Sequence, residues 1–148
     1  MHEPDHAGLG AGVMIESLRP GTRLPDRHYL IDQALIARYA QVSGDMNPLH
    51  LDPEFAGRTK FGRTIAHGMM TLAFVSRVMR DWAGDAWEKR GYLRVAFVAP
   101  VFAGDTLIVR TEVQTVASAA AECKVECWVG DRLTLTGEAG IREVAGDG

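Results

Sequence analysis

The chain has 148 residues, of which 47% are hydrophobic and 24% charged, and this composition is typical of one globular domain. Its net charge of −3 disfavours a nucleic-acid partner, because proteins that bind nucleic acid usually carry a basic face. The longest run without a charged residue, Thr64 to Ser76, has 13 residues. A membrane-spanning helix needs about 20, so no membrane segment is expected.

The first 13 residues have no hydrophobic periodicity and lack the basic and apolar regions of a secretory signal. We therefore expect residues 1–13 to form a disordered leader and residues 14–148 to form a single domain. A protein without a secretory signal is expected in the cytoplasm.

The first half of the domain has a strand and then helical periodicity. A short strand is predicted from Arg27 to Ile31. Asp32 suits an N-cap and Gly44 a helix stop, so a helix of about ten residues is predicted between them. Residues 44–52 hold Gly, Asn, Pro and two Asp, and they are predicted to form a turn or loop. A short helix followed by loops is expected for residues 53–64.

A second helix is predicted from Gly68 to Gly84. Its sequence is apolar on nearly every face, through Met69, Met70, Leu72, Ala73, Phe74, Val75, Val78 and Met79. A helix of this kind is expected to be enclosed by other elements.

Beyond residue 90 the hydrophobic period changes from about 3.6 residues to 2, which indicates strands. Alternation covers residues 93–97, 107–113, 123–129 and 133–141, and Gly130-Asp131 suits a two-residue hairpin turn. Each strand has one apolar and one polar face, which predicts an antiparallel sheet that covers a core on one side. With the long helix, the predicted class is α+β.

The two cysteines are predicted to lie in one of these strands. Cys123 and Cys127 are four residues apart, and four residues of strand span about 13 Å. A disulfide needs Cα atoms within about 7 Å. We therefore expect two free thiols on one face of the strand, in a reducing compartment.

Two dense clusters interrupt these segments. The first, Ser43 to Asp52, includes an aspartate and a histidine five residues apart. The second, Phe61 to Met70, includes His67 and Gly68. Taken alone, the first cluster is explained by an aspartate in an Asx turn beside a surface histidine. No group of Cys, His and carboxylate residues has the spacing of a metal site.

Together the two clusters resemble the MaoC-like hydratase motif. In that motif an Asp-x-Asn-Pro-(Leu/Ile)-His-x-Asp segment precedes a Phe-Gly-x-x-Ile-Ala-His-Gly-Met segment. Residues 97–107 also resemble that family's strand, turn and strand, so the resemblance covers about residues 16 to 144. It implies a hot-dog fold, in which a curved antiparallel sheet wraps a central helix, and it implies a homodimer or larger assembly.

The resemblance further implies an (R)-specific enoyl-CoA hydratase. Such an enzyme reversibly hydrates trans-2-enoyl-CoA to (R)-3-hydroxyacyl-CoA, with the coenzyme A thioester as substrate and with no cofactor or metal. By resemblance, Asp45 and His50 hold one water and share the proton transfers, in either order. Gly68 begins the long helix, where unpaired backbone N–H groups suit the thioester oxyanion. The alternative is a glycine required only for packing.

The remaining site residues are secondary. Ser76 matches a site-lining serine that bonds Asp45 or His50, or else bonds its own helix backbone. Asn47 and His67 are also expected to line the site. Asn47 orders the loop or contacts substrate, and His67 packs where the helix begins or takes a direct catalytic role. A local basic patch is expected to contact coenzyme A phosphates or to form a solvated face; it consists of Arg58, Lys60 and Arg63.

Three other functions compete with the hydratase. A (3R)-hydroxyacyl-[acyl-carrier-protein] dehydratase performs the same chemistry. The net charge of −3 mildly disfavours an acidic carrier protein, but the basic patch of Arg58, Lys60 and Arg63 would suit one. A hot-dog thioesterase usually has a carboxylate on the central helix, and residues 68–78 have none. A non-catalytic acyl-CoA sensor would carry a DNA-binding segment, for which residues 1–30 are too short and not basic enough.

Overall fold

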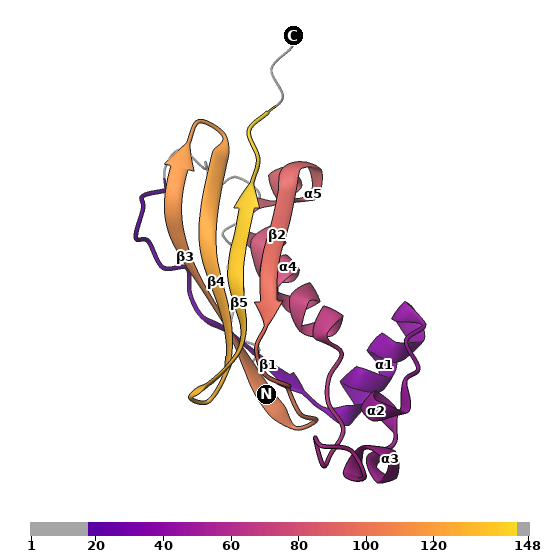
Figure 1. The fold of residues 1–148 in the computed structure, drawn as a ribbon. Helices are drawn as coiled ribbons and strands as arrows, with labels where there is room; N and C mark the ends of the chain where they lie inside the picture. Colours follow the sequence, from indigo (N-terminus) through magenta and orange to yellow (C-terminus); the bar gives the residue numbers. More distant parts are fainter. Residues whose placement is uncertain (1–17, 145–148) are drawn as a thin grey trace, which may run out of the picture.

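A computed structural model of the protein describes residues 18–144. Within them, five strands form one antiparallel sheet in the order β1-β3-β4-β5-β2. Helix α4 (Gly68–Ala83) lies along one face of this twisted sheet (Figure 1). The arrangement confirms the predicted α+β class and the hot-dog architecture. The predicted leader, residues 1–13, lies outside the described residues.

The strands lie where the period-2 pattern places them. Their bounds are β1 Arg27–Ile31, β2 Gly91–Phe97, β3 Asp105–Ala117, β4 Ala120–Val129 and β5 Arg132–Ile141. Val129 pairs with Arg132, so Gly130-Asp131 forms the predicted two-residue hairpin turn. Successive antiparallel hairpins thus build β3, β4 and β5, while β1 and β2 form the two edges of the sheet.

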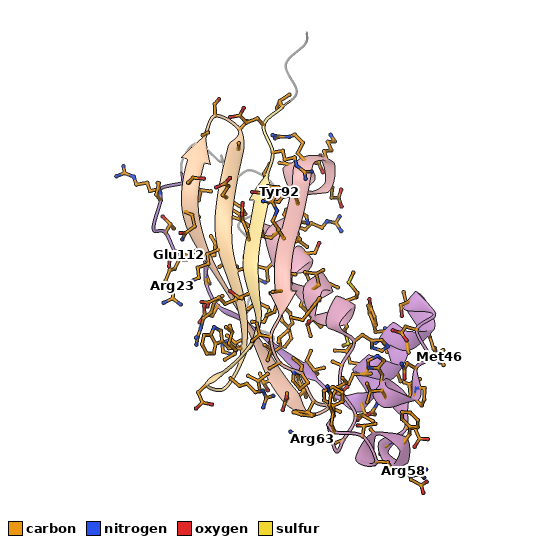
Figure 2. All side chains as sticks on the ribbon, in the orientation of Figure 1. Arg23, Met46, Arg58, Arg63, Tyr92 and Glu112 are labelled. Carbon is orange, nitrogen blue, oxygen red and sulfur yellow. The ribbon has the colours of Figure 1, made fainter. Side chains whose placement is uncertain are left out.

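The two faces of the sheet differ in chemistry. The inner face is buried and carries Leu107, Val109, Val113, Cys123, Val125, Cys127, Leu135, Ala139 and Ile141. The polar face, which includes Glu112 (Figure 2), carries a row of alternating charge across four strands. In that row Glu112 pairs in register with Lys124, Lys124 with Glu138, and Glu138 with Arg94.

Helix α4 packs on the inner face through one side only. Met70, Val75 and Met79 are almost fully buried against the sheet, whereas Met69 is 60% exposed. The prediction of a helix enclosed on every side is therefore wrong for the single chain. The reason is that the sheet covers one side of α4, and the described residues supply no second layer over the rest.

Capping residues determine where the helices before α4 begin and end. Helix α1 (Gln33–Ser43) begins where Asp32 accepts a hydrogen bond from Leu35 N and ends at Gly44, whose φ is 80°, as predicted. The predicted loop at residues 44–52 instead contains helix α2 (Pro48–Leu51), because Asn47 caps it and proline suits the first turn.

Two further helices complete the fold. Helix α3 (Pro53–Gly57) confirms the short helix expected there, while α5 (Asp85–Arg90) was not predicted. Figure 1 shows α1, α2 and α3 grouped beside the start of α4. Within residues 18–144, no helix combines the length and the apolar character needed to cross a membrane.

Both cysteines are free and buried on the inner face of β4, as predicted. Burial raises the pKa of each thiol to about 12. We therefore expect Cys123 and Cys127 to resist Ellman's reagent in the folded protein at mildly alkaline pH and to react once guanidinium unfolds it. Thiols in an unfolded chain ionise near pH 8.5, so the free energy of unfolding should fall as the pH rises above that value. Rapid labelling of the native protein would contradict this burial.

Candidate active site

Local hydrogen bonds hold the first sequence cluster in shape. Asp45 Oδ1 accepts from Asn47 N at 3.2 Å, and Asn47 Oδ1 accepts from Leu49 N at 3.0 Å. The Asx-turn interpretation of Asp45 is therefore confirmed, as is the role of Asn47 in ordering the loop. The turn uses Oδ1 of Asp45 and leaves Oδ2 free to meet His50 from helix α2.

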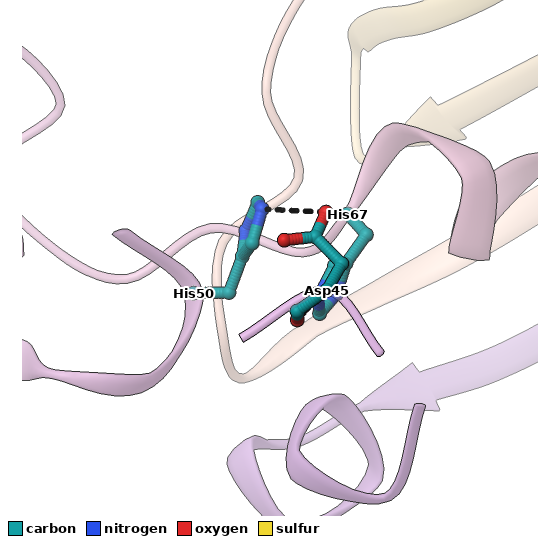
Figure 3. A group of neighbouring side chains, drawn as sticks. All are labelled: Asp45, His50 and His67. Atoms are coloured by element: carbon teal, nitrogen blue, oxygen red, sulfur yellow. Dashed lines mark hydrogen bonds and ion pairs between the residues drawn. The ribbon is translucent and has the colours of Figure 1, made fainter. Parts of the chain in front are cut away.

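Asp45 and His50 face one another. Asp45 Oδ2 lies 3.9 Å from His50 Nε2 (Figure 3). On its other side, His50 Nδ1 lies 2.8 Å from the carbonyl oxygen of Ile65. A carbonyl only accepts hydrogen bonds, so Nδ1 carries a proton and Nε2 is the ring nitrogen that faces Asp45; in the neutral tautomer this leaves a lone pair on Nε2.

The gap between the two groups suits a third partner. A separation of 3.9 Å exceeds hydrogen-bond length, yet one oxygen atom fits beside the gap within hydrogen-bonding distance of both groups. The side chain of Asp45 is 53% exposed and that of His50 only 11%. The pair thus combines a carboxylate that solvent reaches with a sheltered imidazole.

The second sequence cluster meets the first at this point. Ile65 N donates to Leu49 O at 3.3 Å, and the Ile65 carbonyl accepts from His50 as described. His67 Nε2 donates to the backbone oxygen of Asp45 at 3.0 Å. The His67 ring stacks on His50 with ring centroids 3.8 Å apart. Both clusters therefore contribute to one site.

Gln33 supports the pair through two hydrogen bonds, a role that the sequence analysis did not predict. Its Nε2 donates to the His50 carbonyl at 2.8 Å, and its Oε1 accepts from the buried Thr64 hydroxyl at 2.6 Å. Gln33 is the first residue of α1, immediately after the Asp32 cap. A glutamine at that position is an ordinary helix residue, so the single sequence carries no signal of this role.

Gly68 lies at the exposed first position of α4, next to a cavity of about 290 Å³. The cavity is mostly apolar and is lined by Phe61, Ile65, Ala66, Gly68, Thr71, Phe97, Val98, Ala99, Pro100, Val101 and Thr134. Within residues 18–144 no side chain caps the start of α4, so its first N–H groups remain available to a ligand. A Cβ at Gly68 would lie 3.2 Å from Phe97 Cε1, so the glycine also serves packing.

Ser76 does not reach the pair. Its hydroxyl accepts from Trp87 Nε1 at 3.0 Å. Ser76 lies eight residues after Gly68 on α4, or about 12 Å along the helix axis. Among the described residues, Ser76 makes neither the predicted hydrogen bond to Asp45 or His50 nor the alternative bond to its own helix backbone. The first fails because Ser76 lies about two turns of α4 away from the helix start, where the pair is located.

The three residues of the basic patch contact different side chains. Arg58 pairs with Glu54 at 3.3 Å, with both side chains exposed, and projects from the outer edge of α3 (Figure 2). Lys60 lies over the ring of Phe61, and Arg63 stacks over Phe102 at 4.0 Å. Arg58 thus suits the solvated-face interpretation, whereas Lys60 neighbours the cavity through Phe61.

The structure brings together three residues that sequence spacing did not mark as a metal group. Asp45, His50 and His67 each place one ligand-type atom within 4.8 Å of the others. However, the two rings are stacked face to face, so their in-plane lone pairs do not converge on one point. One nitrogen of each ring also already contacts a carbonyl oxygen. The arrangement suits proton transfer better than metal binding.

Known proteins resemble this chain in sequence and structure. A family model described as a MaoC like domain matches residues 18–131. The 3-hydroxybutyryl-CoA dehydratase of Methylorubrum extorquens is 34% identical over 118 residues, which cover 76% of this chain and 73% of that protein. The (R)-specific enoyl-CoA hydratase of Aeromonas caviae is 34% identical over 74% of this chain and 84% of that protein. A solved R-hydratase from Pseudomonas aeruginosa, unliganded, has a TM-score of 0.78 and 26% identity over 90% of this chain and 92% of its own.

Removing the Gln33 side-chain amide should destabilise the site. In Gln33→Leu the His50 carbonyl and the Thr64 hydroxyl lose their partner, so the free energy of unfolding should fall by about 1–3 kcal/mol. Urea titration measures this change. Gln41→Leu, an exposed position on the same helix, is the matched control and should change stability by less than about 0.5 kcal/mol. Equal effects in the two variants would contradict the supporting role.

Proposed function

Since the chain belongs to the MaoC-like domain family of hydro-lyases, we propose that it is an (R)-specific enoyl-CoA hydratase. The proposed reaction is the reversible hydration of trans-2-enoyl-CoA to (R)-3-hydroxyacyl-CoA. One observation carries the proposal: the Asp45 carboxylate and the Nε2 lone pair of His50 face each other across 3.9 Å. The two similar proteins named above support a coenzyme A thioester as the substrate.

In the proposed hydration, Asp45 and His50 hold one water between them. As the water oxygen bonds to C3, one member of the pair takes its proton and the C2=C3 π electrons move toward the thioester carbonyl. A proton is then delivered to C2 of the resulting enolate. Because the two groups share these transfers, we treat them as one coupled acid–base unit. These reaction steps need only proton transfers, so no cofactor is proposed.

The enolate oxygen needs stabilisation, and we assign that role to the start of α4. The N–H groups at Gly68 have no side-chain cap, and the dipole of this 16-residue helix is positive at that end. Backbone donors of this kind stabilise an oxyanion without reorganising during the reaction. The neighbouring cavity is mostly apolar, which favours an acyl thioester over a charged substrate.

The basic residues near the cavity suit the phosphate-bearing end of coenzyme A. Lys60 lies next to Phe61, which lines the cavity, and we propose that it contacts a coenzyme A phosphate together with Arg63. Arg58 contributes less to such a contact, because Glu54 already neutralises it. Turnover of matched coenzyme A and acyl-carrier-protein thioesters separates this proposal from the carrier-protein dehydratase.

Asp45→Asn tests the acid–base pair. Asn keeps an Oδ1 that accepts from Asn47 N, so the turn and the melting temperature should be preserved, but it cannot take a proton. We expect kcat to fall by about 10²–10⁴-fold with a small change in KM, measured by loss of the conjugated thioester absorbance. His50→Ala should fall similarly, and the double variant should be little worse than either.

Asp52→Asn is the matched control for this experiment. Asp52 Oδ1 caps α3 by accepting from Glu54 N and Phe55 N, and in the described part of the chain its side chain forms no hydrogen bond or ion pair with Asp45 or His50. The control should retain nearly full activity. If a folded Asp45→Asn variant hydrates enoyl-CoA at nearly the original rate, Asp45 has only its turn role and the proposed pair is wrong.

We also propose that the protein is a homodimer or a multiple of one. Strand β2 is a sheet edge, and its end exposes Phe97 and the adjoining Val98 by 52% and 55%. Unpaired edges and exposed apolar side chains favour association with a second copy. Light scattering at micromolar concentration should give at least twice the mass of one chain. A stable monomer would contradict the proposal.

A further inference from the structure

We propose that His67 is a positioning residue that aligns both members of the acid–base pair, an inference that rests on the proposed hydratase function. His67 is 2% exposed and does not line the cavity beside Gly68. It is therefore placed to act through its neighbours and not by touching substrate. Two separate contacts, one to Asp45 and one to His50, carry the inference.

The first contact fixes the Asp45 backbone. Asp45 N donates to Ser43 Oγ and Asp45 Oδ1 accepts from Asn47 N, so both of these bonds are local. Among the described residues, the hydrogen bond recorded between Asp45 and a distant segment is the one from His67 Nε2 at 3.0 Å. That bond joins the exposed turn to the start of α4 and so sets where Oδ2 of Asp45 lies.

The second contact fixes the ring of His50. The hydrogen bond from Nδ1 to Ile65 O holds one end of the imidazole, but the ring can still tilt about that bond. The His67 ring lies 3.8 Å away at an interplanar angle of 27° and blocks that tilt. Tyr39 contacts His67 with ring centroids 4.8 Å apart, so α1 supports the stack.

The second ring nitrogen of His67 takes no part in these contacts. Its Nδ1 is buried and has no hydrogen-bond partner among the described residues. The ring is therefore held through Nε2, which donates to Asp45, and through its stacking with His50 and Tyr39.

Two variants separate the two contacts. His67→Gln keeps an N–H donor for the Asp45 carbonyl but removes the ring, whereas His67→Phe keeps a ring against His50 but removes the donor. We expect each to lower kcat about tenfold with KM changed less than twofold, and His67→Ala to lower kcat about 100-fold. The controls are His28→Gln and His28→Phe on the exposed side of β1, which should leave kcat unchanged.

Readouts other than rate exclude a merely structural role. The pH profile of kcat/KM should shift in His67→Phe, because the carboxylate of Asp45 is no longer held at its distance from His50. The ring ¹⁵N signals of His50 should report one tautomer, with the proton on Nδ1, both in the wild-type protein and in His67→Gln, because the bond to Ile65 O is kept. They should broaden in His67→Gln, because the ring is then free to tilt about that bond. A circular-dichroism melt measures the folded fraction, to which kcat is normalised.

The outcomes decide between the alternatives. Normal kcat in folded His67→Ala, or losses that vanish after correction for the folded fraction, would overturn the positioning role. If His67→Ala fails to fold, the Gln and Phe variants decide, since each retains one contact. A wild-type protein that hydrates no enoyl-CoA would refute the proposed function instead, whereas an active wild type with unaffected His67 variants refutes this inference alone.

Discussion

The hydrogen bond from His50 Nδ1 to the Ile65 carbonyl is the contact on which the rest of the site depends. It selects the tautomer of His50, and so determines that Nε2 meets Asp45 as an acceptor. It also joins α2 to the segment that leads into α4, and Ile65 itself bridges to Phe102 just before β3. The imidazole is thereby tied to the segment that leads into β3, although His50 comes from a four-residue helix.

In each of the two side chains, one atom bonds to the backbone and another faces the partner residue. Asp45 Oδ1 closes a turn, while Oδ2 faces His50. His50 likewise gives Nδ1 to the backbone and keeps Nε2 for the carboxylate. This division lets Asp45 close the turn and face His50 at the same time, while the carboxylate stays half exposed and the His50 ring stays sheltered. It also explains why a turn role for Asp45 is compatible with a catalytic one.

Much of the fold was predictable, because its signals are local. The Asp32 cap, the Gly44 stop and the period-2 strands each follow from a few neighbouring residues. Helix α2 was missed since Asn47 and Pro48 suit a turn as well as a helix start.

The predictions for the site failed where a side chain's orientation depends on a distant element. Ser76 was placed by its position in a motif, but the motif does not reveal that Ser76 lies beside Trp87 of α5, which donates to its oxygen. Gln33 reaches from α1 to the His50 carbonyl and Thr64, and the stack of His67 on His50 joins the start of α4 to α2. No single segment of the sequence encodes these contacts.

The row of alternating charges on the polar face of the sheet also bears on how the strands find their register. A slip of β4 along β3 by two residues would keep every apolar side chain facing inward, so hydrophobic burial alone does not reject it. Such a slip would set Glu112 opposite Glu122 or Glu126 in place of Lys124. Like charges directly opposite are destabilising. The charged side chains on the solvent-facing side of the hairpin therefore disfavour, during folding, misaligned strand pairings that hydrophobic burial alone would permit.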